Sequence, residues 1–381
     1  IKLKLKKNIP FSKPDIIEED LQIVLEVIKS GWLAHGAYST YLEDLFCEYT
    51  GANFATTVSN CTAGLHLSCI AANFKKGDEI ILPSQTHVAT AHAIEFTGAK
   101  PIFVDVDPLT GCILIRKIKE KINSNTKGII PVHMAGYPCN MKDIKSICDE
   151  SGLILIEDCA HGIGTVYDGI HAGNFGSSGC FSFYPTKQIT TGEGGVVISN
   201  NQNFIEKIKR MKAFGIDTPP ELRTKPGFYD VKELGYNYRM TDFQAALGLG
   251  QLKRYNKNVK RRRKNARLYC DLLDSREDII FTSFSQQNSY FLFQIILKST
   301  INRDKVMLEL KKNGIGVSIH YATPVPLMSY YKNKYGYQPI DFPNAVNYAN
   351  QSISLPVHQN LNADDIDYVC KKIIKILDKL C

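Results

Sequence analysis

Strand-like and helical segments alternate through the middle of this chain, and this alternation restricts the fold more than any other feature. Helical spacing ends near residue 72 and returns at about 88–97 and 141–151. Apolar, strand-like runs lie at residues 54–58, 79–82, 101–106, 127–132, 153–157, 180–184 and 195–199. Such alternation produces a mostly parallel sheet with helices on both faces. We therefore predict an α/β fold whose ligand binds beyond the carboxyl ends of the strands.

A long helix is expected from residue 242 to about 273, and the pattern changes beyond it. Strands are then expected at 290–297 and 317–320, and helices at 303–313 and 363–380. This second pattern is typical of a smaller α+β domain. The sequence thus predicts a large domain, residues 1–255, and a small C-terminal domain, residues 256–381. The large domain begins with an N-terminal arm and with helices at 14–30 and 40–49, the first of which has Ile17, Leu21, Val24, Leu25 and Ile28 on one face.

The composition is that of a soluble globular protein, with 44% hydrophobic and 22% charged residues among 381. No apolar run is long enough to span a bilayer. Residues 1–7 are basic but lack the apolar core and cleavage site of a secretory signal. The 11 cysteines are scattered and odd in number, which favours reduced thiols. We expect a cytoplasmic protein with no membrane partner.

Much of the net charge of +8 lies in the run from Lys257 to Lys264. The run continues an apolar helical pattern, so we interpret it mainly as a solvated helix face. It could also attract an anionic substrate, and nucleic-acid binding is a weaker alternative. The prediction is that nucleic acid is not a partner.

Lys187 is the most conspicuous candidate for chemistry. It follows the aromatic, strand-like residues 181–184 and precedes a Gly-rich turn, so we expect it at the end of a buried strand. Burial disfavours the charged ammonium and makes proton loss easier. A neutral lysine amine can form a Schiff base with an aldehyde. A solvated surface lysine is the ordinary alternative.

Other polar residues follow the predicted strands. Asp158 ends the strand at 153–157, and a carboxylate there can pair with a protonated pyridine nitrogen, although a helix cap or salt bridge explains it equally. Residues 59–64 are small and hydroxylated and open a helix, which makes either an anion site, with Ser182 as an added hydroxyl, or a plain helix cap. His87 could stack on a flat cofactor and His161 could hydrogen-bond a ring hydroxyl, although either could be an ordinary polar or core residue.

Other chemistries have no matching motif. The glycines at 162–164 and 192–195 do not form the dinucleotide-binding pattern, and neither group opens a helix. There is no Walker loop and no nucleophile elbow. No His/Cys group has the spacing of zinc ligands, so no metal is predicted.

Taken in order, the motifs resemble one family over nearly the whole chain. The segments 157–161 (EDCAH), 181–187 (FSFYPTK) and 190–195 (TTGEGG) are similar to the DegT/DnrJ/EryC1/StrS sugar aminotransferases, as are 30–33, 77–80, 90–93 and 236–242. The resemblance implies the aspartate aminotransferase fold, called fold type I, with pyridoxal 5'-phosphate as cofactor and pyridoxamine 5'-phosphate during turnover.

The resemblance also implies roles for individual residues. Lys187 forms the Schiff base and then moves the proton of the 1,3-shift, and Asp158 pairs the pyridine nitrogen. The phosphate is held by Ser182 and by the turn made of Cys61, Thr62 and Ala63. His161 stands where many members have Gln near the ring oxygen, and His87 where many have a larger aromatic ring. Either Asn237 or Arg239 is expected to reach the phosphate from the second subunit of a homodimer.

The implied reaction moves an amino group from L-glutamate to a nucleotide-linked keto sugar, with a 4-keto-6-deoxy hexose as the leading substrate, in amino-sugar synthesis for surface glycans. His320 and Tyr321 are expected to contact the sugar or its diphosphate. Some relatives replace the lysine by His and are sugar dehydrases, so Lys187 favours transamination. A dehydrase or isomerase and a non-catalytic regulatory protein are the alternatives.

Overall fold

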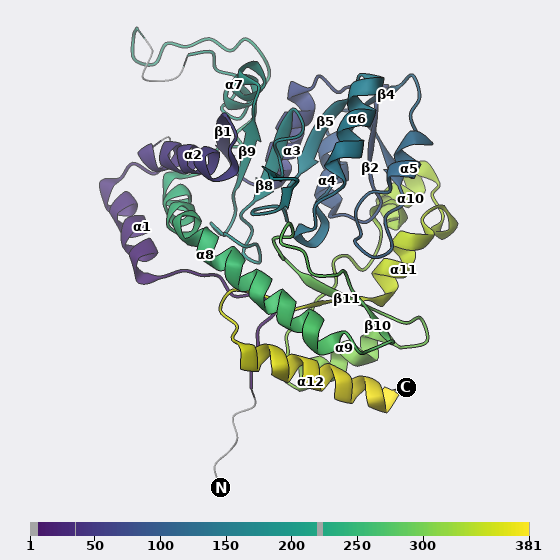
Figure 1. Ribbon diagram of the computed structural model, residues 1–381. Coiled ribbons are helices and arrows are strands. Elements are labelled where there is room, and N and C mark those ends of the chain that lie inside the picture. The colour runs from purple at the N-terminus through teal and green to yellow at the C-terminus, as the bar shows by residue number, and fades with distance from the viewer. Residues whose placement is uncertain (1–6, 35, 219–223, 381) are drawn as a thin grey trace.

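The computed structural model describes residues 7–34, 36–218 and 224–380, and most of the basic N-terminal segment, His35 and Cys381 lie outside these ranges. A seven-stranded sheet forms the centre of the large domain, in the order β1–β9–β8–β5–β4–β2–β3 (Figure 1). Its strands are β1 (Phe54–Val58), β2 (Glu79–Pro83), β3 (Lys100–Val104), β4 (Thr126–Ile129), β5 (Ile154–Asp158), β8 (Ser178–Ser182) and β9 (Gly195–Ser199). All pairings are parallel except those of β9, which is antiparallel to β8 and β1. The predicted α/β fold with a mostly parallel sheet is confirmed.

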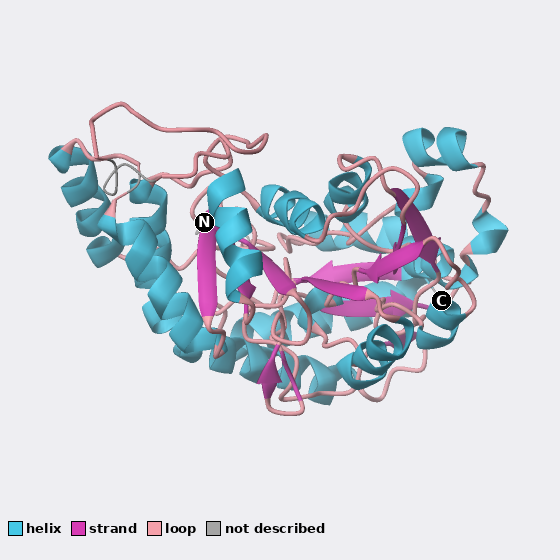
Figure 2. Cartoon of the chain, turned by 90° about the horizontal axis from the view of Figure 1, so that it is seen from above, coloured by secondary structure: helices cyan, strands magenta, loops and turns pink. Residues whose placement is uncertain are grey.

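Helices cover both faces of the sheet (Figure 2). One face carries α3 (Cys61–Ala71), α4 (Val88–Glu95) and α7 (Gln202–Met211). The opposite face carries α2 (Ala37–Thr50), α5 (Ile115–Lys119), α6 (Met141–Ser151) and the first half of α8 (Asp242–Leu273). Side chains alternate between the faces, because neighbouring strand residues point in opposite directions. Cys180 therefore packs on the α3 side, whereas the ring of Phe181 lies 4.9 Å from that of Phe46 in α2.

The long helix α8 belongs to two hydrophobic cores. Tyr255 and Val259 pack beneath the large sheet, whereas Ala266 and Tyr269 pack in a second core. That core contains an antiparallel sheet of β10 (Ile279–Ile280), β11 (Phe293–Leu297) and β12 (Ser352–Leu355), with α9 (Arg303–Lys312) and α12 (Ala363–Leu380). Helix α12 lies beside the end of α8 (Figure 1). The arm residue Ile9 also joins this second core.

Shorter elements complete the described chain. Helices α10 (Ser329–Tyr335) and α11 (Pro343–Gln351) pack back on the large domain, and β6 (Val166–Tyr167) and β7 (Ile170–His171) form a hairpin. The predicted strand at 317–320 is wrong, because only Ser318 pairs there, in a single bridge to Ser354. Within the described ranges, no helix is long and apolar enough to cross a membrane.

The first helix, α1 (Glu18–Ser30), starts later than predicted and is turned outward. Its first turn is fixed by Asp20, whose carboxylate accepts the N–H of Ile17 at 3.0 Å and pairs with Arg254 of α8 at 2.6 Å. The apolar face predicted for this helix is largely exposed: Leu21, Leu25 and Ile28 are each more than two-fifths accessible. This apolar face of α1 can be shielded from water only by contact with another surface.

The basic run in α8 is not simply a solvated face, so that interpretation is corrected. Arg262 is buried, and its Nη1 donates to the carbonyl of Tyr290 at 3.2 Å. Arg263 Nη2 donates to the carbonyl of Gly164 at 2.9 Å. Burial lowers the pKa of Arg262 to about 10. Both guanidinium groups bind backbone oxygens of neighbouring loops and therefore fix α8 in place, whereas Lys257, Lys260, Arg261 and Lys264 are exposed.

Candidate active site

A cavity of about 660 Å³ lies at the carboxyl ends of β5 and β8, beside the first turns of α3 and α4. Nine of the predicted site residues line it: Cys61, Thr62, Ala63, His87, Asp158, Ser182, Lys187, His320 and Tyr321. Three predicted residues do not: His161, Asn237 and Arg239. None of the basic residues between Lys257 and Lys264 lines it either.

Lys187 lies in the loop that follows β8, where its N–H donates to the carbonyl of Tyr184 at 2.9 Å. Its Nζ lies 4.6 Å from the centroid of the Phe291 ring, an apolar neighbour that offers no hydrogen bond acceptor. Burial lowers the pKa of Lys187 to about 8, although Cys61 and Asp158 oppose the shift. A substantial fraction of the amine is therefore neutral near physiological pH, as a nucleophile for an aldehyde requires.

Asp158 is the last residue of β5 and is almost fully buried. Thr90 Oγ1 donates to its Oδ2 at 2.8 Å, and the N–H of Ala160 donates to its Oδ1 at 3.0 Å. Each carboxylate oxygen has two lone-pair directions, so one remains on each for a ligand in the cavity. The carboxylate is thus held at the cavity wall by two different elements, α4 and the turn after β5.

The first turn of α3 offers an anion site. Asn60 caps the helix, since its Oδ1 accepts the N–H of Ala63 at 2.8 Å, as the plain capping interpretation required. The N–H groups of Cys61 and Thr62 belong to the first turn, whose donors have no partner within a helix. Ser182 adds a hydroxyl at the end of β8. A Cβ on Gly195 would lie 2.9 Å from the backbone nitrogen of Cys61, so this glycine lets β9 approach the turn.

The two histidines predicted near the cofactor ring occupy different positions. His87 caps α4 through Nδ1, which accepts the N–H of Ala89 at 3.2 Å, and its ring lines the cavity. Burial lowers its pKa, with Lys187 adding to the effect, so the ring is neutral and free to stack. His161 lies behind the wall, and its Nε2 faces the hydroxyl of Tyr321 at 3.2 Å. Of the two residues, Tyr321 lines the cavity and His161 does not.

His320 lines the cavity beside Tyr321 and is held from outside it. Its Nδ1 lies 3.1 Å from the hydroxyl of Ser354, and its ring stacks on Phe11 with centroids 5.6 Å apart. Burial lowers the pKa of His320 to about 3, with Lys187 and His87 adding to the effect. The His320 ring is therefore uncharged and lines the cavity, so it does not provide a positive charge for binding a diphosphate.

The segment from Tyr236 to Arg239 is extended, and its side chains alternate in direction. Tyr236 and Tyr238 stack on each other at 5.0 Å and contact the ring of His66 in α3. Arg239 Nε donates to Asn237 Oδ1 at 3.0 Å, and its guanidinium lies 4.9 Å from the Phe214 ring. Only Tyr238 of this segment lines the cavity of its own chain.

Several residues of the site were missed from the sequence. Thr90, Phe291, His66 and Tyr238 hold or line the cavity. All four lie in segments that the sequence analysis matched to the family or expected as helices or strands, but no local pattern showed that these side chains gather at one cavity. Phe291 comes from the segment before β11, more than a hundred residues from Lys187, so only the tertiary fold brings the two together.

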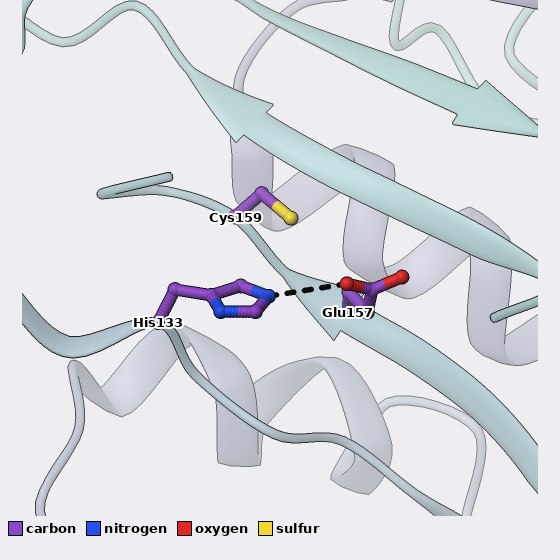
Figure 3. A group of neighbouring side chains, drawn as sticks. All are labelled: His133, Glu157 and Cys159. Atoms are coloured by element: carbon purple, nitrogen blue, oxygen red, sulfur yellow. Dashed lines mark hydrogen bonds and ion pairs between the residues drawn. The ribbon is translucent and has the colours of Figure 1, made fainter. Parts of the chain in front are cut away.

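Behind the cavity, His133, Glu157 and Cys159 offer ligand atoms within 4.8 Å of one another (Figure 3). His133 Nε2 lies 3.1 Å from Glu157 Oε2, and His133 Nδ1 accepts the N–H of Cys139 at 3.2 Å. Both Glu157 oxygens also accept backbone N–H groups, from Gly173, Phe175 and Gly176. Because protein donors occupy these atoms, the group is a buried polar network that fixes the end of β5 rather than a metal centre.

The comparisons with known proteins agree with this geometry. A protein of Methanocaldococcus jannaschii is 39% identical over 97% of this chain and 98% of its own length. GDP-perosamine synthase of Escherichia coli O157:H7 is 34% identical over 96% of this chain and 98% of its length. The Streptococcus pneumoniae protein named "putative sugar aminotransferase Spr1654", solved in its PMP form, superposes with a TM-score of 0.93 at 27% identity, covering 98% of this chain and 100% of that chain.

Fold and site together define a pyridoxal-phosphate-dependent aminotransferase. The donor set fits the cofactor: an amine of lowered pKa for the aldehyde, a carboxylate for the ring nitrogen and a helix N-terminus for the phosphate. The family model of the DegT/DnrJ/EryC1/StrS aminotransferases matches residues 14–374, and this chain belongs to that family. The family predicted from the sequence motifs is confirmed, and so is the cofactor.

Proposed function

We propose that this enzyme transfers the amino group of L-glutamate to the keto carbon of a nucleotide-linked sugar, a 4-keto-6-deoxy hexose. The observation that carries the proposal is the meeting of Lys187 and Asp158 in one cavity, beside the anion site of α3. The cavity, at about 660 Å³, has room beside the cofactor for a substrate. A relative at 34% identity is named GDP-perosamine synthase, a name that contains a nucleoside diphosphate sugar.

Each side chain has a distinct task in this proposal. When bound, pyridoxal phosphate supplies an aldehyde that takes up the amino group and a cationic ring that accepts electrons. Lys187 Nζ would take a proton from the donor carbon that bears the amino group and return it to the cofactor's former aldehyde carbon, which suits an amine of pKa about 8. Asp158 would keep the ring nitrogen protonated, and the Cys61 and Thr62 N–H groups with the Ser182 hydroxyl would hold the phosphate. His87 would stack on one face of the ring.

We also propose that the active enzyme is a homodimer whose sites are shared. Asn237 and Arg239 do not line the cavity of their own chain, as expected for side chains that reach the cavity of a second copy. The outward apolar face of α1 and the nearby Trp32, which is 63% exposed, offer a surface that a second copy can bury. One second copy of this chain would explain both why Asn237 and Arg239 lie outside their own cavity and why the apolar face of α1 is exposed.

The proposal is tested with purified protein, L-glutamate and a panel of nucleotide-linked 4-keto-6-deoxy sugars. Amino transfer predicts release of 2-oxoglutarate in equal amount to the amino sugar. Lys187→Ala should abolish both products, because no other described amine lines the cavity. Full turnover by Lys187→Ala would overturn the mechanism. Loss of water from the sugar without 2-oxoglutarate would instead identify a dehydrase.

A further inference from the structure

A directed chain of hydrogen bonds runs from the backbone of Ala135 to the cavity. The N–H of Ala135 donates to His161 Nδ1 at 3.3 Å, and His161 Nε2 lies 3.2 Å from the hydroxyl of Tyr321. Ala135 has φ +58°, in the left-handed region that alanine adopts at a cost of about 1 kcal/mol. The loop is held there, since the carbonyl of Ala135 accepts the N–H of Leu292 at 3.2 Å.

This chain fixes which nitrogen of His161 carries the proton. Nδ1 accepts a hydrogen bond, so it bears no proton. Burial keeps the pKa of His161 well below its usual range, with Lys187 adding to the effect, so the ring is neutral. A neutral imidazole has one N–H, which must be on Nε2. His161 therefore donates to Tyr321, and the oxygen of Tyr321 is the acceptor.

The proton of the Tyr321 hydroxyl is consequently left for another acceptor. Tyr321 lines the cavity, whereas His161 does not. Burial raises the pKa of Tyr321, and Asp158 adds to the effect, so the phenol stays protonated and remains a donor. The Tyr321 hydroxyl is thus a neutral donor. Its oxygen accepts the N–H of His161, and its proton can point toward a bound ligand.

The neighbours of Tyr321 indicate which ligand atom receives this proton. His161 follows Asp158 by three residues, and its ring lies 4.3 Å from that of Phe291, against which Lys187 Nζ also packs. The ring of His87 lies 5.5 Å from that of Tyr321. Tyr321 therefore contacts His87, assigned to the ring face, and is joined to Lys187 through His161 and Phe291. Asp158 is close enough to raise the pKa of its hydroxyl. The ring oxygen of pyridoxal phosphate is bonded to the carbon next to the one that bears the aldehyde.

We propose that Tyr321 donates a hydrogen bond to this ring oxygen and that His161 is a positioning residue that orients the Tyr321 hydroxyl. The assignment rests on the proposed function, since it places pyridoxal phosphate in this cavity. It differs from the sequence-based expectation, in which His161 itself contacts the ring hydroxyl. It also moves Tyr321 from the substrate to the cofactor.

The first test is the pH titration of the visible absorbance of the bound cofactor, without substrate. A donor stabilises negative charge on the ring oxygen, so its removal by Tyr321→Phe should raise the pH midpoint by about one unit. His161→Leu should give a shift in the same direction, and His161→Gln, which keeps an N–H donor, should reverse most of it. Tyr184→Phe is the matched control, because Tyr184 lines the same cavity without contacting His161. It should titrate like the wild type.

The second test needs no cofactor. In the cofactor-free protein labelled with ¹⁵N-histidine, His161 should show a protonated Nε2 and an unprotonated Nδ1. The opposite tautomer would overturn the role of His161, and a wild-type titration for Tyr321→Phe would overturn the role of Tyr321. A change confined to the KM of the sugar would assign Tyr321 to the substrate instead. If the wild-type protein takes up no pyridoxal phosphate, the proposed function fails together with this assignment.

Discussion

The hydroxyl of Thr90 donates a 2.8 Å hydrogen bond to Oδ2 of Asp158. Thr90 lies in α4 and Asp158 ends β5, so the bond joins two elements 68 residues apart in the chain. The hydroxyl of Thr86 lies 2.8 Å from that of Thr90 and extends the network into the turn before α4. The carboxylate proposed to pair with the cofactor nitrogen is therefore oriented by the helix whose first residue follows His87.

Replacing Thr90 with Val should weaken cofactor binding while preserving the fold. Valine has a similar shape but no hydroxyl, so Asp158 loses one of its two fixed bonds. A hydrogen bond to a charged group contributes roughly 1.5 kcal/mol, which corresponds to about a tenfold increase in the Kd of pyridoxal phosphate. Equilibrium dialysis against the cofactor measures the change.

The matched control is Thr97→Val, just beyond the C-terminal end of α4. Its hydroxyl donates to the carbonyl of Ile94 at 2.7 Å and does not line the cavity. Its Kd should equal that of the wild type. Equal affinities for Thr90→Val and Thr97→Val would show that the Thr90 bond does not orient Asp158.

Sequence patterns predicted side chains at the ends of strands better than side chains whose positions depend on tertiary packing. Lys187, Asp158 and Ser182 were predicted because the strands before them are continuous apolar runs. They line one cavity, since the ends of parallel strands meet at one edge. Helix α8 was predicted with its observed bounds, Asp242–Leu273. Long periodic segments give a strong signal, since each turn repeats the pattern.

The errors arose where distant parts of the chain decide the structure. The inward turn of Arg262 depends on the carbonyl of Tyr290, which no local pattern reveals. His161 was predicted to contact the cofactor ring; it does not line the cavity, whereas Tyr321, 160 residues away, lines it and lies 3.2 Å from His161 Nε2. Residues 317–320 have strand-like composition, yet most of the segment lacks a partner strand. Sequence reading supplies candidates, whereas their order around the cavity comes from the fold.

The reaction of Lys187 with pyridoxal phosphate should depend on pH with a midpoint near 8. Only the neutral amine attacks an aldehyde, and the pKa of Lys187 is lowered to about 8. The rate for cofactor-free protein should therefore rise about tenfold per pH unit below the midpoint and become level above it. Stopped-flow absorbance between pH 6 and 9.5 measures this. A rate that still rises steeply at pH 9.5 would indicate an ordinary, solvated lysine.

Two inactive variants should complement each other if the sites are shared. In a hybrid dimer of Lys187→Ala with Asn237→Ala/Arg239→Ala, one site has an intact lysine and receives intact Asn237 and Arg239 from the other chain. Differently tagged chains allow the hybrid to be purified, and it should have about half of the wild-type activity, because one of two sites is complete. A hybrid as inactive as its parents would place Asn237 and Arg239 in their own chain's site.

The exposed face of α1 should be needed for dimerisation. Leu25 is 44% exposed in the single chain, and a glutamate there would bury an unpaired charge in the proposed interface. Leu25→Glu should therefore shift the protein toward monomer in sedimentation velocity. Ile340→Glu is the control, because Ile340 is 83% exposed and lies far along the chain in the segment between α10 and α11. Equal behaviour of the two variants would mean that α1 lies outside the interface.

Glu157→Gln should destabilise the protein without changing the outline of the side chain. The buried carboxylate accepts three backbone N–H groups, from Gly173, Phe175 and Gly176, and faces Nε2 of His133. The amide of glutamine has one oxygen and one NH₂, so in either orientation donors face a group that cannot accept them. Each unsatisfied buried donor costs about 1–3 kcal/mol, so the free energy of unfolding should fall by roughly 3 kcal/mol.

Urea denaturation monitored by circular dichroism measures this loss, with Glu48→Gln as the control on the exposed side of α2. The control should stay within about 0.5 kcal/mol of the wild type, because exposed substitutions have small effects.

The same assay separates a hydrogen-bonded network from a metal centre. If protein donors occupy Glu157 and His133, a chelator leaves the wild-type midpoint unchanged, since there is no bound ion to remove. A chelator that lowers the midpoint to that of Glu157→Gln would show that an ion, rather than the backbone N–H groups, holds this end of β5.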